Sequence, residues 1–198
     1  MNNIILILTG TLMHATPLLF AALGGVISES SGVMNIALEG VMTFGAFTGA
    51  AVAYATNSSW LGFFMAGLAG ALLISLHAIA SITFRADQTI SGTAINFLGP
   101  GLSLLLAKKM FNGSALSPTA PKLPILFLKN LTEKWRGTTL ENLNISVGVV
   151  IAFALVLFIW LLFYRTKWGL RILATGQHPA AVDTLGVNVY VMRYICVI

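Results

Sequence analysis

Charged side chains are scarce in this sequence. Only 9% of its 198 residues are Asp, Glu, Lys or Arg, whereas 57% are hydrophobic; an ordinary soluble domain carries roughly 25% charged residues. This shortage excludes a soluble globular domain. The basic residues that produce the net charge of +5 lie between apolar runs, where they act as topological anchors. We therefore expect an integral membrane protein in contact with a lipid bilayer, and no nucleic-acid partner.

Residues that bind metals or support covalent catalysis are also rare. Cys196 is the only cysteine, which excludes an intramolecular disulfide. His77 has no Cys, Asp or second His at ligand spacing, so we expect no metal site. The patterns G-x-x-x-x-G-K-[ST], G-x-S-x-G and H-E-x-x-H are absent. We therefore predict that the chain is not an enzyme and that it binds no cofactor.

Long apolar runs are abundant. About 20 apolar residues are enough to cross the hydrocarbon core of a bilayer as a helix. Five runs reach this length, and a sixth begins at Tyr190: Ile4–Ile27, Val33–Thr56, Ser59–Phe84, Gln88–Met110 and Ile145–Tyr164. The sequence predicts an all-α, polytopic transmembrane helix bundle of about five full spans plus the start of a sixth. We expect a single domain over residues 1–198, truncated at its C-terminus.

Polar residues follow one face of the second predicted span. Asn35, Glu39 and Thr43 are spaced four residues apart, so in a helix they project in one direction. A carboxylate in the middle of a membrane costs about 3 kcal/mol and usually faces a bundle interior or an aqueous path. Glu39 is near the end of its helix, however, so capping or local pairing at the interface remains an alternative.

A second polar face runs along the fourth predicted span, with Thr89, Thr93, Asn96, Pro100 and Ser103. Hydroxyl and amide groups can bind a neutral polar solute, although hydrogen bonds between helices, worth about 0.6–2 kcal/mol each, are the alternative. The Gly99-Pro100-Gly101 sequence predicts a helix break of the kind that lines a cavity.

These two faces define a predicted substrate path, which we expect to converge on one central cavity. The spacing of small residues also predicts close helix contacts at Gly45 with Gly49 and at Ala66 with Gly70. The path is almost uncharged and has Phe97 nearby, which suits a neutral solute with hydroxyl groups and a flat apolar face. We assign five residues to the path: Asn35, Glu39, Thr93, Asn96 and Ser103.

Two polar segments separate or follow the spans. Residues 111–144 contain Pro118, Pro121 and Pro124, and we expect an external loop with a short amphipathic element around Leu128–Trp135. Residues 165–190 open with basic residues and contain a short amphipathic unit, Pro179–Leu185. Proline suits the first turn of a helix, and Gly186 suits a left-handed stop. This pattern predicts a short helix at the membrane edge.

At this second segment the sequence resembles a known family. WGLRILATGQHPAAVDTLGVNV, residues 168–189, resembles the cytoplasmic coupling loop of ABC-importer permeases in the branched-chain amino acid, ribose and nucleoside group. The resemblance extends to GGVISESSGVMNIALEG at residues 24–40 and to DQTISGTAINFLGPGLS at residues 87–103. These segments look most like the nucleoside and simple-sugar branch.

The resemblance implies a permease subunit, multi-pass in a bacterial cell (inner) membrane, that translocates a nucleoside or simple sugar. Its implied partners are a separate ATP-binding ABC subunit, a second permease subunit and an extracytoplasmic substrate-binding protein. The binding protein would face residues 111–144, for which a solvated connector is the alternative. The cytoplasmic loop 165–190 would contact the ATPase through seven residues: Arg171, Gln177, Pro179, Ala180, Ala181, Asp183 and Gly186.

Other transport functions remain open from the sequence. The same group includes branched-chain amino acid permeases, but a charged amino acid fits poorly in an uncharged path. An ion-coupled secondary transporter usually has several intramembrane charges, and here Glu39 stands alone. The distribution of basic residues does not decide the orientation of the chain. If residues 165–190 are cytoplasmic, five basic residues lie inside: Arg85, Arg165, Lys167, Arg171 and Arg193. Six then lie outside: Lys108, Lys109, Lys122, Lys129, Lys134 and Arg136.

Overall fold

Helices make up the regular structure of the chain. The computed structural model describes residues 2–124 and 145–198, and every regular element within these ranges is a helix. The predicted all-α bundle is therefore confirmed. The amphipathic element expected around Leu128–Trp135 lies outside the described residues.

The long helices correspond closely to the apolar runs. They are α1 (Asn2–Ser30), α2 (Leu38–Thr56), α3 (Ser59–Ala78), α4 (Gln88–Met110) and α6 (Val147–Arg165), with a π-helical turn, η1 (Ile79–Thr83), continuing α3. Within the described ranges, four segments are long and apolar enough to cross a membrane: Leu6–Ser30, Ser59–Thr83, Gln88–Met110 and Val147–Arg165. The 19-residue helix α2, predicted as the second of five spans, is not among these four.

Short polar side chains begin several of these helices. Asp87 Oδ1 accepts hydrogen bonds from the backbone N–H groups of Thr89 and Ile90, and Ser146 Oγ accepts one from Gly148. Such caps satisfy N–H groups that have no partner inside the helix. Asn57, at φ 51°, ends α2 in the left-handed conformation that asparagine tolerates.

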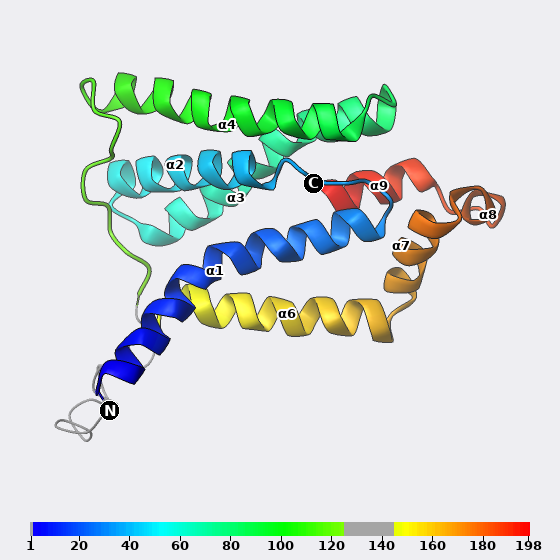
Figure 1. The fold of residues 1–198 in the computed structure, drawn as a ribbon, viewed down its shortest axis with the longest axis horizontal. Helices are drawn as coiled ribbons and strands as arrows, with labels where there is room; N and C mark the ends of the chain where they lie inside the picture. Colours follow the sequence, from blue (N-terminus) through cyan, green and yellow to red (C-terminus); the bar gives the residue numbers. More distant parts are fainter. Residues whose placement is uncertain (1, 125–144) are drawn as a thin grey trace.

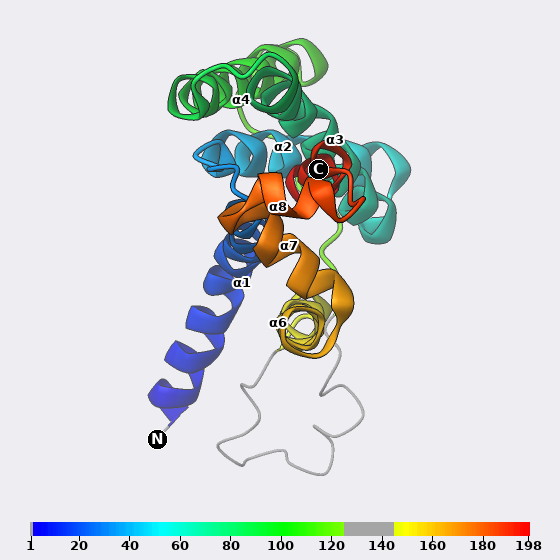
Figure 2. The same ribbon diagram turned by 90° about the vertical axis from the view of Figure 1, so that its right-hand side faces the viewer.

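The helices alternate in direction across the molecule. In Figure 1, α1, α3 and α6 run toward the end that carries α7 (Lys167–Gln177), α8 (Pro179–Thr184) and α9 (Val189–Val197), and α2 and α4 run back from it. Figure 2, viewed from that end, shows α7 and α8 in front, with α4 above and α6 below. The described part of the predicted external loop, residues 111–124, starts from the opposite end.

Close helix contacts hold α2 against both of its neighbours. A Cβ on Gly49 would lie 3.0 Å from the Cβ of Ala66, and one on Gly45 would lie 3.3 Å from the carbonyl oxygen of Ala66, so the predicted packing role of these small residues is confirmed. The contact of α2 with α4 is tighter. A Cβ on Gly99 would lie 2.2 Å from the carbonyl oxygen of Gly40, so only glycine fits there.

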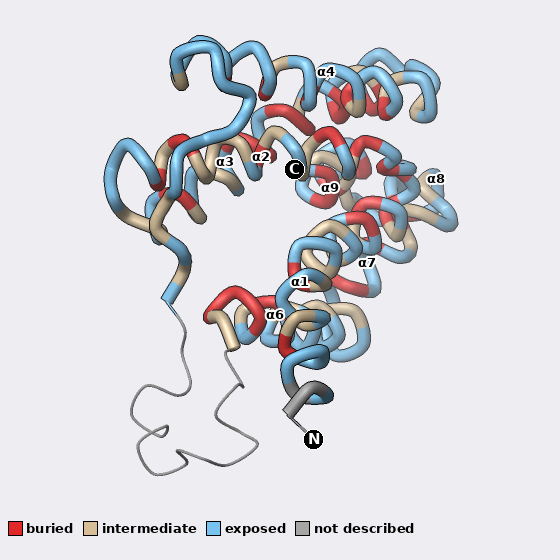
Figure 3. Tube along the Cα trace, turned by 60° about the vertical axis from the view of Figure 1, so that its left-hand side comes forward, coloured by how far each residue is buried: buried red, intermediate tan, exposed pale blue. Residues whose placement is uncertain are grey.

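Buried residues gather beside this contact. Figure 3 shows buried segments of the tube where α2, α3, α4 and α9 meet, while the outer faces are exposed. The apolar core there comprises Val33, Ala37, Leu73, Ile74, Ala78, Ile82, Ile95 and Val197. The outward-facing surface is largely apolar, as expected for helices surrounded by lipid.

Two local predictions are wrong. Residues 33–37 are not helical, since α2 begins at Leu38 and not at Val33. The predicted break at Gly99-Pro100-Gly101 is absent, because α4 continues from Gln88 to Met110 with Pro100 inside it. Packing of Gly99 against Gly40 holds α4 in place through this stretch, and that contact cannot be seen in local propensity.

Candidate functional site

A short non-helical segment between α1 and α2 lies at the centre of the polar contacts. We call residues 31–37 the joint. Gly32 has φ +86°, and Ser28 Oγ donates to the carbonyl oxygen of Val33 at 2.9 Å. Ser28, Ser31 and Val33 are almost fully buried. Lipid cannot satisfy the polar groups of a non-helical backbone, so partners inside the protein stabilise such a segment.

Side chains from α3 and α4 hold the middle of the joint. His77 is completely buried; its Nε2 lies 3.2 Å from the carbonyl oxygen of Met34, and its Nδ1 lies 3.0 Å from Ser91 Oγ. The backbone N–H of Met34 donates to Gln88 Oε1 at 2.7 Å. Both backbone groups of Met34 are therefore satisfied by side chains, which gives His77 a packing and bonding role.

Asn96 of α4 joins the end of the joint to the first turn of α2. Its Nδ2 donates to the carbonyl oxygen of Ile36, and its Oδ1 accepts the backbone N–H of Gly40, both at 2.8 Å. The Gly40 N–H is one of the groups at a helix start that have no intrahelical partner. Asn96 thus acts as a cap supplied by a neighbouring helix.

Three other predicted path residues lie on α2 and α4, in different environments. Glu39 is exposed in the first turn of α2, where the helix dipole favours a negative charge. Thr93 is exposed, and its hydroxyl donates to Thr89 O at 2.7 Å. Ser103 is buried, and its hydroxyl donates to Gly99 O at 2.7 Å. These hydroxyls bond within their own helix.

Asn35 differs from the expectation most clearly. It belongs to the joint and not to α2, so it does not share a helical face with Glu39 and Thr43. Its side chain is 6% exposed, and within the described residues its Oδ1 has no hydrogen-bond partner. Buried polar atoms normally have a partner. Asn35 Oδ1 can therefore still accept a hydrogen bond from a group outside these contacts.

The predicted path residues are only partly brought together. Asn96 contacts the residue next to Glu39, and a Cβ on Gly92, beside Thr93, would lie 3.0 Å from Ile36 Cβ. Ser103 lies about two turns farther along α4. Convergence on one cavity stays a prediction.

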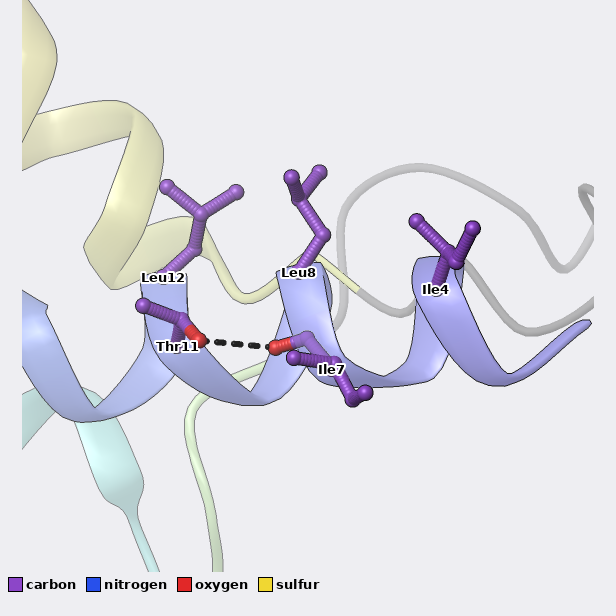
Figure 4. Close-up of a pocket in the computed structure, with 5 residues that line it drawn as sticks. All are labelled: Ile4, Ile7, Leu8, Thr11 and Leu12. Atoms are coloured by element: carbon purple, nitrogen blue, oxygen red, sulfur yellow. Dashed lines mark hydrogen bonds between the residues drawn. The ribbon is translucent and has the colours of Figure 1, made fainter. Parts of the chain in front are cut away.

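Two surface hollows lie elsewhere. One is on the first turns of α1, where Ile4, Leu8 and Leu12 project outward and the Thr11 hydroxyl donates to Ile7 O at 2.9 Å (Figure 4). Its lining is nearly all apolar, and its single hydroxyl is already bonded to the helix. The other lies between Tyr54 and residues 110–118. Neither hollow includes a predicted path residue.

The predicted short helix in residues 165–190 is present. Helix α8 has Pro179 in its first turn, and Gly186 follows it with φ +80°. Val182 is buried, while Ala180, Ala181 and Asp183 are exposed. A helix this short is marginal in water by itself, and the buried Val182 anchors it.

The sequence analysis missed α7. Thr166 caps the start of this helix, since its hydroxyl accepts the Gly169 N–H. The buried residues of α7 are Gly169, Ile172 and Thr175. Their spacing of three is helical, but glycine and threonine hid the pattern from a search for apolar residues. Arg171 and Gln177 lie on its exposed side.

Together these elements form one surface, which we call the α7–α8 surface. Six of its seven predicted contact residues are exposed and Pro179 is half-buried: Arg171, Gln177, Pro179, Ala180, Ala181, Asp183 and Gly186. The far side of α7 touches the joint, because a Cβ on Gly176 would lie 3.1 Å from the backbone nitrogen of Gly32.

Comparison with known proteins places the sequence in a family. The family described as "Branched-chain amino acid transport system / permease component" matches residues 7–198. The guanosine ABC transporter permease protein NupQ of Bacillus subtilis is 40% identical over 96% of this chain and 61% of its own length. The nucleoside ABC transporter permease protein NupC of Lactococcus lactis is 32% identical, over 98% of this chain and 62% of its own.

A third relative comes from an archaeon. The putative glucose ABC transporter permease protein TsgC13 of Haloferax volcanii is 34% identical over 97% of this chain and 58% of its own length. The chain thus spans about three-fifths of the length of these relatives. No solved structure matches it significantly. The family match across nearly all of its residues, together with the apolar helices, shows that this multi-pass membrane chain belongs to the branched-chain amino acid transport system permease-component family.

Proposed function

We propose that this chain is the membrane-spanning permease subunit of an ABC importer for a nucleoside or simple sugar. The observation that carries the proposal is the α7–α8 surface, on which a separate ATP-binding subunit would dock. Ala180 and Ala181 are small and exposed, while Val182 anchors the same helix. A prearranged surface loses less conformational freedom on binding than a flexible loop would.

The proposed topology follows from this assignment. Residues 165–190 are cytoplasmic, and residues 111–144 face the outside, where they meet an extracytoplasmic binding protein or act as a solvated connector. The N-terminus is then outside. A second permease subunit, identical or related, completes the pathway, and the complex lies in a bacterial cell membrane.

The proposed solute rests on two kinds of support. Two relatives carry the words guanosine and nucleoside in their names, and a third carries glucose. The proposed path residues Asn35, Thr93, Asn96 and Ser103 are uncharged, with Glu39 as the exception. A neutral solute therefore fits better than a branched-chain amino acid, which is the second candidate because the family description names it.

Copurification tests the docking proposal. The permease would be coexpressed with its ATP-binding subunit, with wild-type protein compared with Ala181→Glu. We expect the variant to insert in the membrane but to lose most of the bound subunit, because a bulky charge replaces a small contact residue. Ala115→Glu is the matched control, since Ala115 is exposed in the loop at the other end of the molecule. Equal recovery of the ATP-binding subunit with Ala181→Glu and wild type would refute the docking role.

Uptake assays test the solute. Cells with and without the complete transporter would receive labelled guanosine, uridine, ribose or leucine in parallel. We expect deletion to abolish uptake of a nucleoside or of the sugar and to leave leucine uptake unchanged. Loss of leucine uptake alone would reject the nucleoside assignment and favour the second candidate.

A further inference from the structure

Helix α9 directly follows the α7–α8 surface and packs against α7. Met192 and Cys196 of α9 form a buried apolar cluster with Ile172 of α7. Val197 belongs to the separate core beside the joint. The N-terminus of α9 is fixed by Asn188, whose Oδ1 accepts the Val191 N–H at 3.1 Å. Helix α9 therefore contacts both the α7–α8 surface and the interior of the bundle.

Two tyrosines on α9 contact the end of η1 and the turn that follows it and leads into α4. Arg85 Nη2 donates to the Tyr190 hydroxyl at 2.9 Å, and the Tyr194 hydroxyl is hydrogen-bonded to Thr83 Oγ1. The two tyrosines are four residues apart, so they lie on one side of the helix. Hydrogen bonding to Tyr190 raises the pKa of the Arg85 guanidinium above its ordinary value.

A third side chain of α9 reaches the joint that leads into α2. Arg193 Nε donates to the carbonyl oxygen of Ser31 at 3.3 Å. The next residue, Gly32, approaches Gly176 of α7 closely, since a Cβ on Gly32 would lie 3.2 Å from Gly176 Cα. The segments entering α2 and α4 are thus both held by α9.

Helices α2 and α4 are themselves locked together. Gly40 and Gly99 are in backbone contact, and Asn96 bonds to both Ile36 and Gly40. Displacement at their starts would move the two helices as one body, as packed helices do in rigid-body transitions. These two helices carry four of the five proposed path residues.

We propose that α9 transmits movement of the α7–α8 surface to α2 and α4, with Tyr190, Tyr194 and Arg193 as positioning residues. This inference rests on the proposed function, because it takes the α7–α8 surface as the place where the ATP-binding subunit acts. The competing route runs from α7 to α6 through the close contact at Gly169, where an added Cβ would lie 2.3 Å from the carbonyl oxygen of Leu162. That route would bypass the two tyrosines.

The test measures how much solute enters per ATP hydrolysed by the complete complex in proteoliposomes. Tyr190→Phe/Tyr194→Phe removes two hydroxyls and keeps both rings. We expect the transport-to-hydrolysis ratio to fall at least about threefold, with copurification of the ATP-binding subunit and ATP hydrolysis unchanged. Tyr54→Phe, at the opposite end of the bundle, is the control and should keep the wild-type ratio.

A second set of variants isolates the Arg85 contact. Arg85→Ala should lower the ratio, and adding Tyr190→Phe should cause no further loss, because both remove the same bond. Arg85→Lys keeps a charged donor and should restore most of the ratio.

Three outcomes separate the hypotheses. A wild-type ratio in Tyr190→Phe/Tyr194→Phe would overturn the role of α9 while leaving the docking proposal intact. A parallel fall of transport and ATP hydrolysis would also overturn it, because that result indicates impaired assembly. Failure of the wild-type permease to bind any ATP-binding subunit would reject the proposed function, and the inference with it.

Discussion

The joint and the α7–α8 surface use polar residues in opposite ways. At the joint, His77, Gln88 and Asn96 direct their side chains at backbone groups of residues 34–40, and every second residue of the joint, from Ser31 to Ala37, is buried. On the α7–α8 surface, Arg171, Gln177 and Asp183 are exposed. The joint is therefore completed by its own chain, whereas the surface is available to a partner.

This difference changes how a polar residue in a membrane helix is interpreted. Asn96 looked like a solute ligand because amides are rare among apolar residues, but both of its polar atoms bond to the backbone of the joint and α2. Unpaired backbone groups are costly in lipid. A polar side chain such as Asn96 can therefore be required for folding, whether or not it also contacts the solute. Asn35 and Glu39 are the path residues that these backbone contacts leave for another role.

The largest expected effect is at the contact between α2 and α4. Gly99→Ala would place a Cβ 2.2 Å from the Gly40 carbonyl oxygen, so the helices must separate. We expect a loss of more than about 3 kcal/mol of stability, or no folded protein. Gly101→Ala is the control, because a Cβ there meets nothing within 4 Å. Thermal unfolding in detergent would compare them, and equal midpoints would contradict the contact.

A smaller loss is expected at the joint itself. Asn96→Leu removes both hydrogen bonds and leaves the Gly40 N–H and the Ile36 carbonyl without this partner, which should destabilise the protein by about 2–3 kcal/mol. Asn96→Asp keeps the acceptor oxygen, so its stability should lie between those of the wild type and Asn96→Leu. Chemical denaturation would measure the change. Unaltered stability combined with weaker solute binding would contradict this structural role and indicate that Asn96 acts mainly as a solute ligand.

The smallest of these effects is expected on the surface side. Val182→Ala removes about two buried carbon atoms from the anchor of α8, which should cost about 1–2 kcal/mol locally with little effect on the unfolding midpoint of the bundle. Weaker copurification of the ATP-binding subunit would accompany it. A large fall in the midpoint would mean that α8 is part of the core and not an attached surface element.

Much of the architecture could be predicted from the sequence. Gln88–Met110 was predicted with the bounds that α4 has, and Pro179 with Gly186 correctly placed α8. These successes rest on local information: an unbroken apolar run and residues with strong terminal preferences. The contact residues of the α7–α8 surface came from the family resemblance, and their proposed docking role is still a prediction.

The errors come from contacts between distant segments. Residues 33–37 continue an apolar run, and their non-helical backbone is stabilised by side chains from other helices, among them His77, Gln88 and Asn96. Pro100 signalled a break that packing at Gly99 overrides. The π-helical turn at Ile79–Thr83 likewise has no local signature in the sequence.

Hydrogen exchange of the permease, alone and bound to its ATP-binding subunit, tests the contrast between the two regions most directly. The amides of Met34 and Gly40 donate to half-buried side-chain acceptors, whereas α8 is a short exposed helix. The account predicts slow exchange of the Met34 and Gly40 amides in both states, and fast exchange across 180–186 that becomes slow when the subunit binds. Fast exchange of the Met34 and Gly40 amides in the free protein, or unchanged exchange of residues 180–186 on binding, would contradict it.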